Sequence, residues 1–337
     1  MRPVAAPLPR AMPAVPISLL DRSRTRSHER PEESLRATVH RAERAEKLGY
    51  HRFWVAEHHG VPGIASAAPT VLMAAVAAAT STIRVGSGGV MLPNHQPLVV
   101  AEQARTLAAL HPGRIDLGIG RSLGFTSGVR KSLRVTEYSP EAFDADLDEL
   151  LAHLGGTGPV RAVPEVDERI GVHLLATGSG LAVAARHGLP VVVGGPALHT
   201  GAGLLAAYRH EYRPSQPWPE PRVTISLEIL IAGTVEEARE LLLPEAVALA
   251  ESRRTGVFAP LRPVRSTELD DYDKKVRSAV ERQLRQAVYG TASQVHEQLT
   301  DLVRRTGADE VLATTSTYDR DALAAADTAL AGLDLRR

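Results

Sequence analysis

The fold of this chain is decided by residues 48–59, which read Leu48-Gly49-Tyr50-His51-Arg52-Phe53-Trp54-Val55-Ala56-Glu57-His58-His59. Residues 53–56 form an apolar run that predicts a strand, and this strand ends directly in an acid and two imidazoles. Residues 31–48, before it, predict a helix that starts at Pro31, has two acids in its first turn and stops at Gly49. The stretch is therefore the junction between two β-α units.

The same alternation extends outward from this junction in both directions. Strands are predicted at residues 15–20, 53–56, 83–86, 115–119, 172–176, 191–193, 223–231 and 310–314, and helices at 31–48, 67–79, 97–111, 140–154, 181–187, 201–212, 235–251 and 293–306. Eight strands with helical patterns between them favour an α/β fold of the (β/α)8 TIM-barrel type, which takes about 250 residues plus insertions. A doubly wound open sheet is the competing architecture, and the number of strands alone does not decide between them.

Composition narrows the class of protein. The 337 residues with 44% hydrophobic content suffice for one barrel-sized domain, expected at residues 14–337. Lys plus Arg equals Asp plus Glu at 39 each, so no net field favours nucleic acid or anionic lipid, and a small molecule is the expected partner. The absence of cysteine excludes disulfides, thiolate metal sites and cysteine nucleophiles. No run approaches the ~20 apolar residues of a membrane span, which indicates a cytoplasmic protein.

Two segments stand outside the alternation. Residues 1–13 contain four prolines and no apolar secretion core, and they predict a flexible N-terminal extension. Residues 252–273 carry prolines, arginines and an acidic cluster without a clear period, which predicts a long, mobile insertion after the seventh strand. This insertion is either a lid or a solvated surface loop.

In a barrel, the active site lies at the C-terminal ends of the strands, so the residues after each strand are the first candidates for chemistry. Glu57, His58 and His59 follow the second strand. Histidine suits proton transfer near neutral pH, and a neighbouring carboxylate can hold its tautomer. The pair could instead be loop histidines satisfied by backbone groups. A zinc site or a metal-dependent hydrolase is disfavoured, because adjacent side chains point apart and the chain has no H-E-x-x-H helix.

Three further loops carry candidate binding residues. Gly88 and Gly89, after the third strand, permit close approach of backbone to a flat ligand, or simply a bend at the barrel mouth. Arg121, after the fourth strand, is either an anion clamp or a surface arginine. The turn Thr177-Gly178-Ser179-Gly180, after the fifth strand, precedes a helix, so its amides and hydroxyls can form a phosphate cradle or an ordinary helix cap.

Taken together, residues 48–59, 62–66, 83–95 and 112–121 resemble the bacterial-luciferase-like flavin monooxygenases, and residues 306–310 extend the likeness towards the C-terminal end. Any one segment is weak, but four in order at barrel spacing are specific. The resemblance implies a (β/α)8 barrel of the bacterial luciferase type. It also implies that reduced FMN lies across the mouth with its ring over Gly88-Gly89, a peptide that is often cis in this family.

The resemblance also assigns roles to residues. The flavin phosphate is expected between Arg121 and a turn formed by Ala176, Thr177, Gly178, Ser179 and Gly180, and His58 matches the catalytic histidine, with His59 and Glu57 beside it. Two positions depart from the pattern. Ala176 and Thr177 stand where many relatives have paired serines, which leaves fewer hydroxyls for the phosphate. Gly120 stands where luciferases have a reactive cysteine, which argues against light emission.

The implied mechanism is addition of O2 to reduced flavin at C4a, giving a hydroperoxide that transfers one oxygen atom to a small organic substrate. Because the chain has no NAD(P)H fingerprint, a separate NAD(P)H:flavin reductase is expected to deliver reduced FMN. Tailoring of an aromatic polyketide in antibiotic biosynthesis is one possible role, and a homodimer is expected. The rival functions are an F420-dependent oxidoreductase of the same superfamily and a non-catalytic flavin-binding subunit.

Overall fold

The computed structural model describes residues 14–195, 197–200 and 202–336, and the predicted extension at residues 1–13 lies outside them. Within the described part, eight parallel strands form a closed barrel: β1 (Ile17–Asp21), β2 (Arg52–Val55), β3 (Arg84–Ser87), β5 (Ile115–Gly120), β6 (Gly171–Leu175), β7 (Val191–Gly194), β8 (Val223–Leu227) and β11 (Glu310–Ala313). Pairing of β3 with β5, at Val85 and Ile115, closes the barrel. The short strand β4 (Val90–Met91) continues beside β5. The predicted (β/α)8 barrel is therefore confirmed, and the open sheet is excluded.

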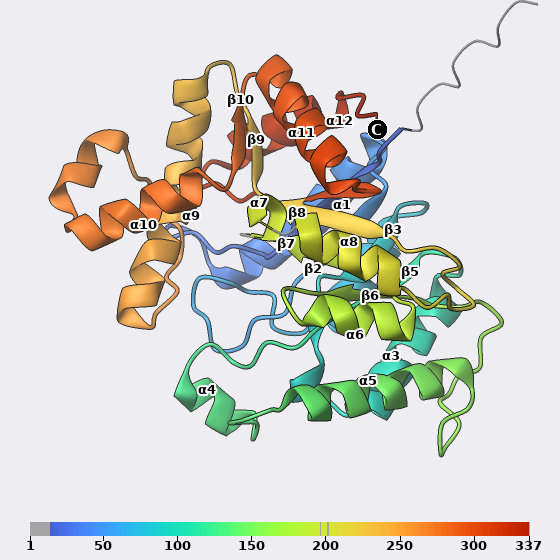
Figure 1. The fold of residues 1–337 in the computed structure, drawn as a ribbon. Coiled ribbons are helices and arrows are strands. Elements are labelled where there is room, and N and C mark those ends of the chain that lie inside the picture. Colours follow the sequence, from blue (N-terminus) through green and yellow to red (C-terminus); the bar gives the residue numbers. More distant parts are fainter. Residues whose placement is uncertain (1–13, 196, 201, 337) are drawn as a thin grey trace, which may run out of the picture.

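Helices surround the barrel (Figure 1). They are α1 (Pro31–Lys47), α2 (Pro69–Ala79), α3 (Pro97–Leu110), α5 (Pro140–Gly155), α6 (Gly180–His187), α7 (Ala197–Thr200), α8 (Ala202–Glu211), α11 (Ala292–Thr306) and α12 (Arg320–Ala331). Between β5 and α5 lies the short helix α4 (Ser127–Ser132), and a 3-10 turn, Leu92–Asn94, follows β4. Among the described residues, no helix combines the length and the apolar character needed to cross a membrane.

The insertion after β8 is larger than the sequence indicates. It comprises β9 (Ile229–Ile231), α9 (Val235–Thr255), a 3-10 turn (Ser266–Asp271), α10 (Lys274–Leu284) and β10 (Val288–Gly290), and β9 pairs with β10. Leu230, Leu243 and Val280 belong to its own small core, and Figure 1 shows α9 and α10 in orange beside the barrel. Thus the predicted strand 223–231 is two strands, because the chain leaves the barrel at Glu228.

Residues 252–273 are not a structureless excursion. The first four complete α9, and Ser266–Asp271 form a 3-10 turn. Leu261 is buried, its N–H donates to the Thr25 carbonyl, and its own carbonyl accepts from the Ser27 N–H. Apolar contacts and backbone hydrogen bonds therefore hold this segment on the loop after β1. Its mobility and its role as a lid stay predictions.

Candidate active site

All four predicted loops start at the same end of the barrel, because the strands that precede them are parallel. Residues 57–59 follow β2, Gly88-Gly89 follow β3, Arg121 follows β5 and residues 176–180 follow β6. Segments up to 123 positions apart in sequence therefore contribute to one mouth. A cavity of about 520 Å³ at this mouth is lined by Glu57, His58, His59, Val61, Met91, Asn94, Ser122, Leu123, Gly124, Phe125 and Arg130.

Glu57 is the hydrogen-bonding centre of the mouth. Its side chain is fully buried and lies 2.6 Å from His59 Nε2 and 3.0 Å from His95 Nε2, and it accepts from the Met91 N–H at 2.9 Å and from Asn94 Nδ2 at 3.2 Å. Burial alone would raise the pKa of the Glu57 carboxyl, but the hydrogen bonds from His59 and His95 outweigh it and lower the pKa to about 2. The carboxylate therefore ties the end of β2 to the segment after β4.

His58 has different surroundings from its neighbour. The neighbouring carboxylate was expected to hold the tautomer of a histidine, and it contacts His59 and His95, because successive side chains point in different directions. The His58 N–H donates to the Ser66 carbonyl, whereas its buried Nδ1 has no hydrogen-bond partner among the described residues. Burial and the charges of Arg22 and Arg24 lower the pKa of His58 to about 4. His58 is therefore neutral at pH 7, and its side chain lines the cavity.

The two arginines near His58 belong to a buried ionic cluster that sequence reasoning missed. Arg22 lies 3.0 Å from Glu245 and 3.5 Å from Glu228, and Arg24 lies 2.7 Å from Glu245. Burial raises the pKa of the Glu228 carboxyl, whereas the two arginines outweigh burial and lower that of Glu245. Glu245 lies on α9, so the insertion contributes a charge to the mouth.

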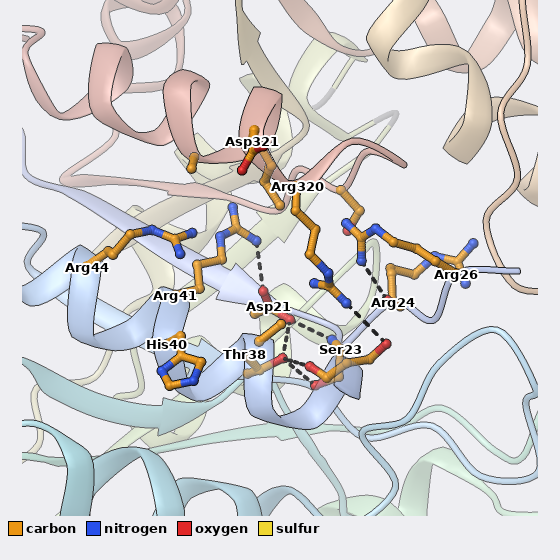
Figure 2. Close-up of a pocket in the computed structure, with 15 residues that line it drawn as sticks. Asp21, Ser23, Arg24, Arg26, Thr38, His40, Arg41, Arg44, Arg320 and Asp321 are labelled. Carbon is orange, nitrogen blue, oxygen red and sulfur yellow. Dashed lines mark hydrogen bonds and ion pairs between the residues drawn. The ribbon is translucent and has the colours of Figure 1, made fainter. Parts of the chain in front are cut away.

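A second network fixes the loop that carries these arginines (Figure 2). Asp21, at the end of β1, accepts from the Ser23 N–H at 2.6 Å, from Thr38 at 2.9 Å and from Arg41 at 2.9 Å. Arg41 also pairs with Asp327 on α12. Asp21, Ser23, Thr38 and Arg41 line a hollow of about 250 Å³ between α1 and α12. Because the hydrogen bonds anchor both ends of the turn, they hold the β1–α1 loop in place at the mouth.

The glycines after β3 leave room where side chains would not fit. The Gly88-Gly89 peptide is cis, as the resemblance implies. A Cβ on Gly88 would lie 2.5 Å from Leu20 Cδ1, and one on Gly89 would lie 2.7 Å from the Gly118 carbonyl oxygen. Ser87 adds a hydroxyl that donates to the same Gly118 carbonyl at 2.8 Å. The pair therefore forms a tightly packed floor, in which the backbone contact at Gly89 leaves no room for a side chain.

The predicted phosphate cradle is brought together across the mouth. Arg121 Nη2 lies 3.4 Å from Ser179 Oγ, although the two residues are 58 positions apart. Thr177, Gly178 and Ser179 are exposed, and Gly180 begins α6, whose N-cap Ser179 makes no side-chain cap. The Gly180 and Leu181 N–H groups already donate to the Thr177 and Gly178 carbonyls, so the exposed hydroxyls of this turn, beside a guanidinium, are the groups that suit an anion. Ala176 is buried, and its N–H already donates to the Val192 carbonyl.

One cluster at the mouth has the spacing of metal ligands. An oxygen of Glu57 and the Nε2 atoms of His59 and His95 lie within 4.8 Å of one another, so a divalent ion could bridge them. The sequence did not indicate this set, because His95 belongs to the loop after a different strand. The same atoms are already hydrogen-bonded to one another, so the cluster can have a structural role without an ion.

Comparison with known proteins gives the site a context. Residues 15–310 match the family model described as luciferase-like monooxygenase. A luciferase-like monooxygenase of Escherichia coli (strain K12) is 35% identical over 91% of this chain and 93% of its own length. N-acetyl-S-alkylcysteine monooxygenase of Bacillus subtilis (strain 168) is 33% identical over 85% of this chain and 88% of its own. The crystal structure of apo-MsnO8 is 32% identical, with a TM-score of 0.85 over 96% of this chain and all of that one.

More distant structures share the fold alone. One is the oxygenating constituent of 3,6-diketocamphane monooxygenase in complex with FMN, at 16% identity and a TM-score of 0.71 over 95% of this chain and 97% of that chain. Another is an F420-dependent secondary alcohol dehydrogenase with an F420-acetone adduct, at 15% identity and a TM-score of 0.69 over 94% of this chain and 97% of that chain. Both cofactors thus occur on this architecture.

Proposed function

The chain belongs to the luciferase-like monooxygenase family, and we propose that it uses reduced FMN and O2 to transfer one oxygen atom to a small organic substrate. The observation that carries this proposal is the combination at one mouth of a glycine floor, an anion cradle and a neutral histidine. Gly88 and Gly89 would lie under the flavin ring, and Arg121 with residues 177–180 would hold its phosphate. Reduced FMN, when bound, supplies the activation of O2.

The residues of the chain would then orient and protect the reaction. His58 is neutral and lines the cavity, so its imidazole can accept a proton there. Glu57 is a positioning residue, because it orients His59 and His95 by hydrogen bonds to their Nε2 atoms. Apolar side chains at Val61, Leu123 and Phe125 would exclude water from the same space.

The delivery of reduced FMN by a separate NAD(P)H:flavin reductase is part of the proposal. The FMN-bound structural neighbour is described as an oxygenating constituent, which is consistent with a second component. Assembly into a homodimer and action on an aromatic polyketide stay predictions.

The test is a reconstituted assay of the full chain with enzymatically reduced FMN, 18O2 and thioether substrates such as N-acetyl-S-benzylcysteine, with catalase present to remove free peroxide. We expect a sulfoxide carrying one 18O atom with reduced FMN and none with NADPH alone. His58→Ala serves as the matched variant, and it should bind FMN without turnover. Tight binding of F420 with anaerobic hydride transfer would replace the proposal by the F420 function, and flavin binding without any turnover would favour a non-catalytic subunit.

A further inference from the structure

The segment between β5 and α5 is strongly basic. Residues 117–136 contain four cations, Arg121, Arg130, Lys131 and Arg134, and no acid. Arg121 lies beside Ser179 in the proposed phosphate cradle, and Lys131 is exposed. Arg130 differs from these two, because it is half-buried and lines the same cavity as His58.

Arg130 lacks an anionic partner. Its Nη1 donates to the Gly124 carbonyl at 3.0 Å, and no carboxylate pairs with it among the described residues. By contrast, Arg22, Arg24 and Arg41 each pair with a buried carboxylate. Removing a guanidinium partly from water without a counter-ion costs free energy. The unused N–H donors of Arg130 therefore suggest that a ligand supplies the acceptor.

The position of Arg130 is built into the structure. Thr126 caps α4 by accepting from the Val129 N–H at 3.2 Å. Val129 packs so closely that a Cβ on Gly60 would lie 2.5 Å from its Cγ2 and one on Gly124 would lie 2.7 Å from its Cγ1. Since Gly60 follows His59 directly, α4 rests on the loop that carries the histidines. The guanidinium is thus held at a defined place relative to His58.

Three apolar side chains share the cavity lining with Arg130. They are Val61, Leu123 and Phe125, and the Phe125 ring meets the Phe258 ring edge-on with centroids 6.4 Å apart. Phe258 belongs to the insertion and also lies under the Arg24 guanidinium at 4.4 Å. A ligand that fits this surface combines a hydrophobic body with one anionic group.

We propose that Arg130 binds the carboxylate of the substrate, so that the enzyme acts on small hydrophobic acids. The inference rests on the proposed function, because it names the substrate class of that same site. The carboxylate would pair with Arg130, the hydrophobic body would lie against Val61 and Phe125, and the oxidised atom would face His58.

The test measures binding, so that it does not depend on turnover. Isothermal titration calorimetry of the full chain, with and without oxidised FMN, uses three acids and their primary amides: 4-phenylbutanoate, octanoate and 3-(benzylthio)propanoate. We expect the wild type to bind the acids at least about 10-fold more tightly than the amides, as a charge-assisted hydrogen bond allows. Arg130→Gln should weaken the acids about 10-fold and leave the amides within twofold. Lys131→Gln, which removes the same charge one residue further on, should change neither.

Several outcomes overturn the proposal. Titration of the wild type alone can refute the proposal, which fails if the protein binds none of the acids more tightly than the corresponding amide. Equal losses in Arg130→Gln and Lys131→Gln would assign the effect to general charge. A loss of FMN affinity in Arg130→Gln as large as the loss of acid affinity would make Arg130 a cofactor contact. Arg130→Lys, which keeps the charge, should retain part of the preference, and this variant covers the case in which the glutamine variant does not fold. The proposed function fails separately, in the 18O2 assay.

Discussion

Replacing Glu57 by glutamine tests the hydrogen-bonding centre of the mouth. The pKa of this carboxyl falls from 4.5 to about 2 on folding, and its side chain is fully buried. At ~1.4 kcal/mol per pKa unit, this difference contributes about 3 kcal/mol to the free energy of unfolding at pH 7. The pKa is lowered on folding, so the contribution is complete above pH 4.5 and disappears as the pH falls towards 2. Glu57→Gln should therefore lower the free energy of unfolding by about 3 kcal/mol at neutral pH.

The assay is urea unfolding followed by tryptophan fluorescence at pH 7, 5, 4 and 3. The gap between wild type and Glu57→Gln should narrow steadily below pH 4.5. Glu165→Gln is the control, because Glu165 forms a surface pair with Arg161, its side chain is 60% exposed and its loss should cost little at any pH. A gap of equal size at pH 7 and pH 3 would refute the reasoning, since it would show that packing and not charge makes Glu57 important.

Three further outcomes are expected. The activity of the wild type should fall on the acid side of its pH profile with a midpoint near pH 4, because neutral His58 is the working form and its pKa is about 4. A midpoint near pH 6.5 would contradict this. Gly89→Ala should abolish FMN binding in a fluorescence titration, since its Cβ would lie 2.7 Å from the Gly118 oxygen, whereas Gly203→Ala, with nothing within 4 Å, should bind normally. Dialysis against a chelator should leave activity unchanged, because His59 and His95 already saturate Glu57; activity restored by one divalent metal would show that the cluster holds an ion.

The barrel was predictable because its signals are local. Each of the eight barrel strands is a short apolar run bounded by turn residues, so each predicted strand covers one strand of the barrel. The short elements and much of the insertion were not predicted. The strands β4 and β10 and the helices α4, α7, α10 and α12 were missed, and β8 and β9 were predicted as one strand. Apolar residues continue across Glu228, and only the three-dimensional partners, Arg22 for Glu228 and β10 for β9, separate the two strands.

The candidate site was predictable only where it follows a strand. Parallel strands bring their C-terminal ends together, so Glu57, Gly88 and Arg121 could be assigned to one mouth from spacing alone. The pairing of Glu57 with His95 could not, because it depends on how the chain turns after Gly89. Arg130 could not be singled out either, because its sequence neighbours are also basic and only the cavity distinguishes it from Lys131.

The insertion is part of the site and not an appendage of the barrel. Glu245 is completely buried and follows Pro244 within α9, yet both of its ion pairs are made with the loop after β1. Burying these charges is favourable only while each has its partner, since a single unpaired member of such a cluster costs about 3–5 kcal/mol. Arg24 in turn contacts Phe258, whose ring meets Phe125 at the cavity wall. The electrostatic setting of His58 and the apolar contact at Phe125 therefore depend on the same inserted segment, so we expect variation in that segment to alter the proposed proton transfer and substrate preference together.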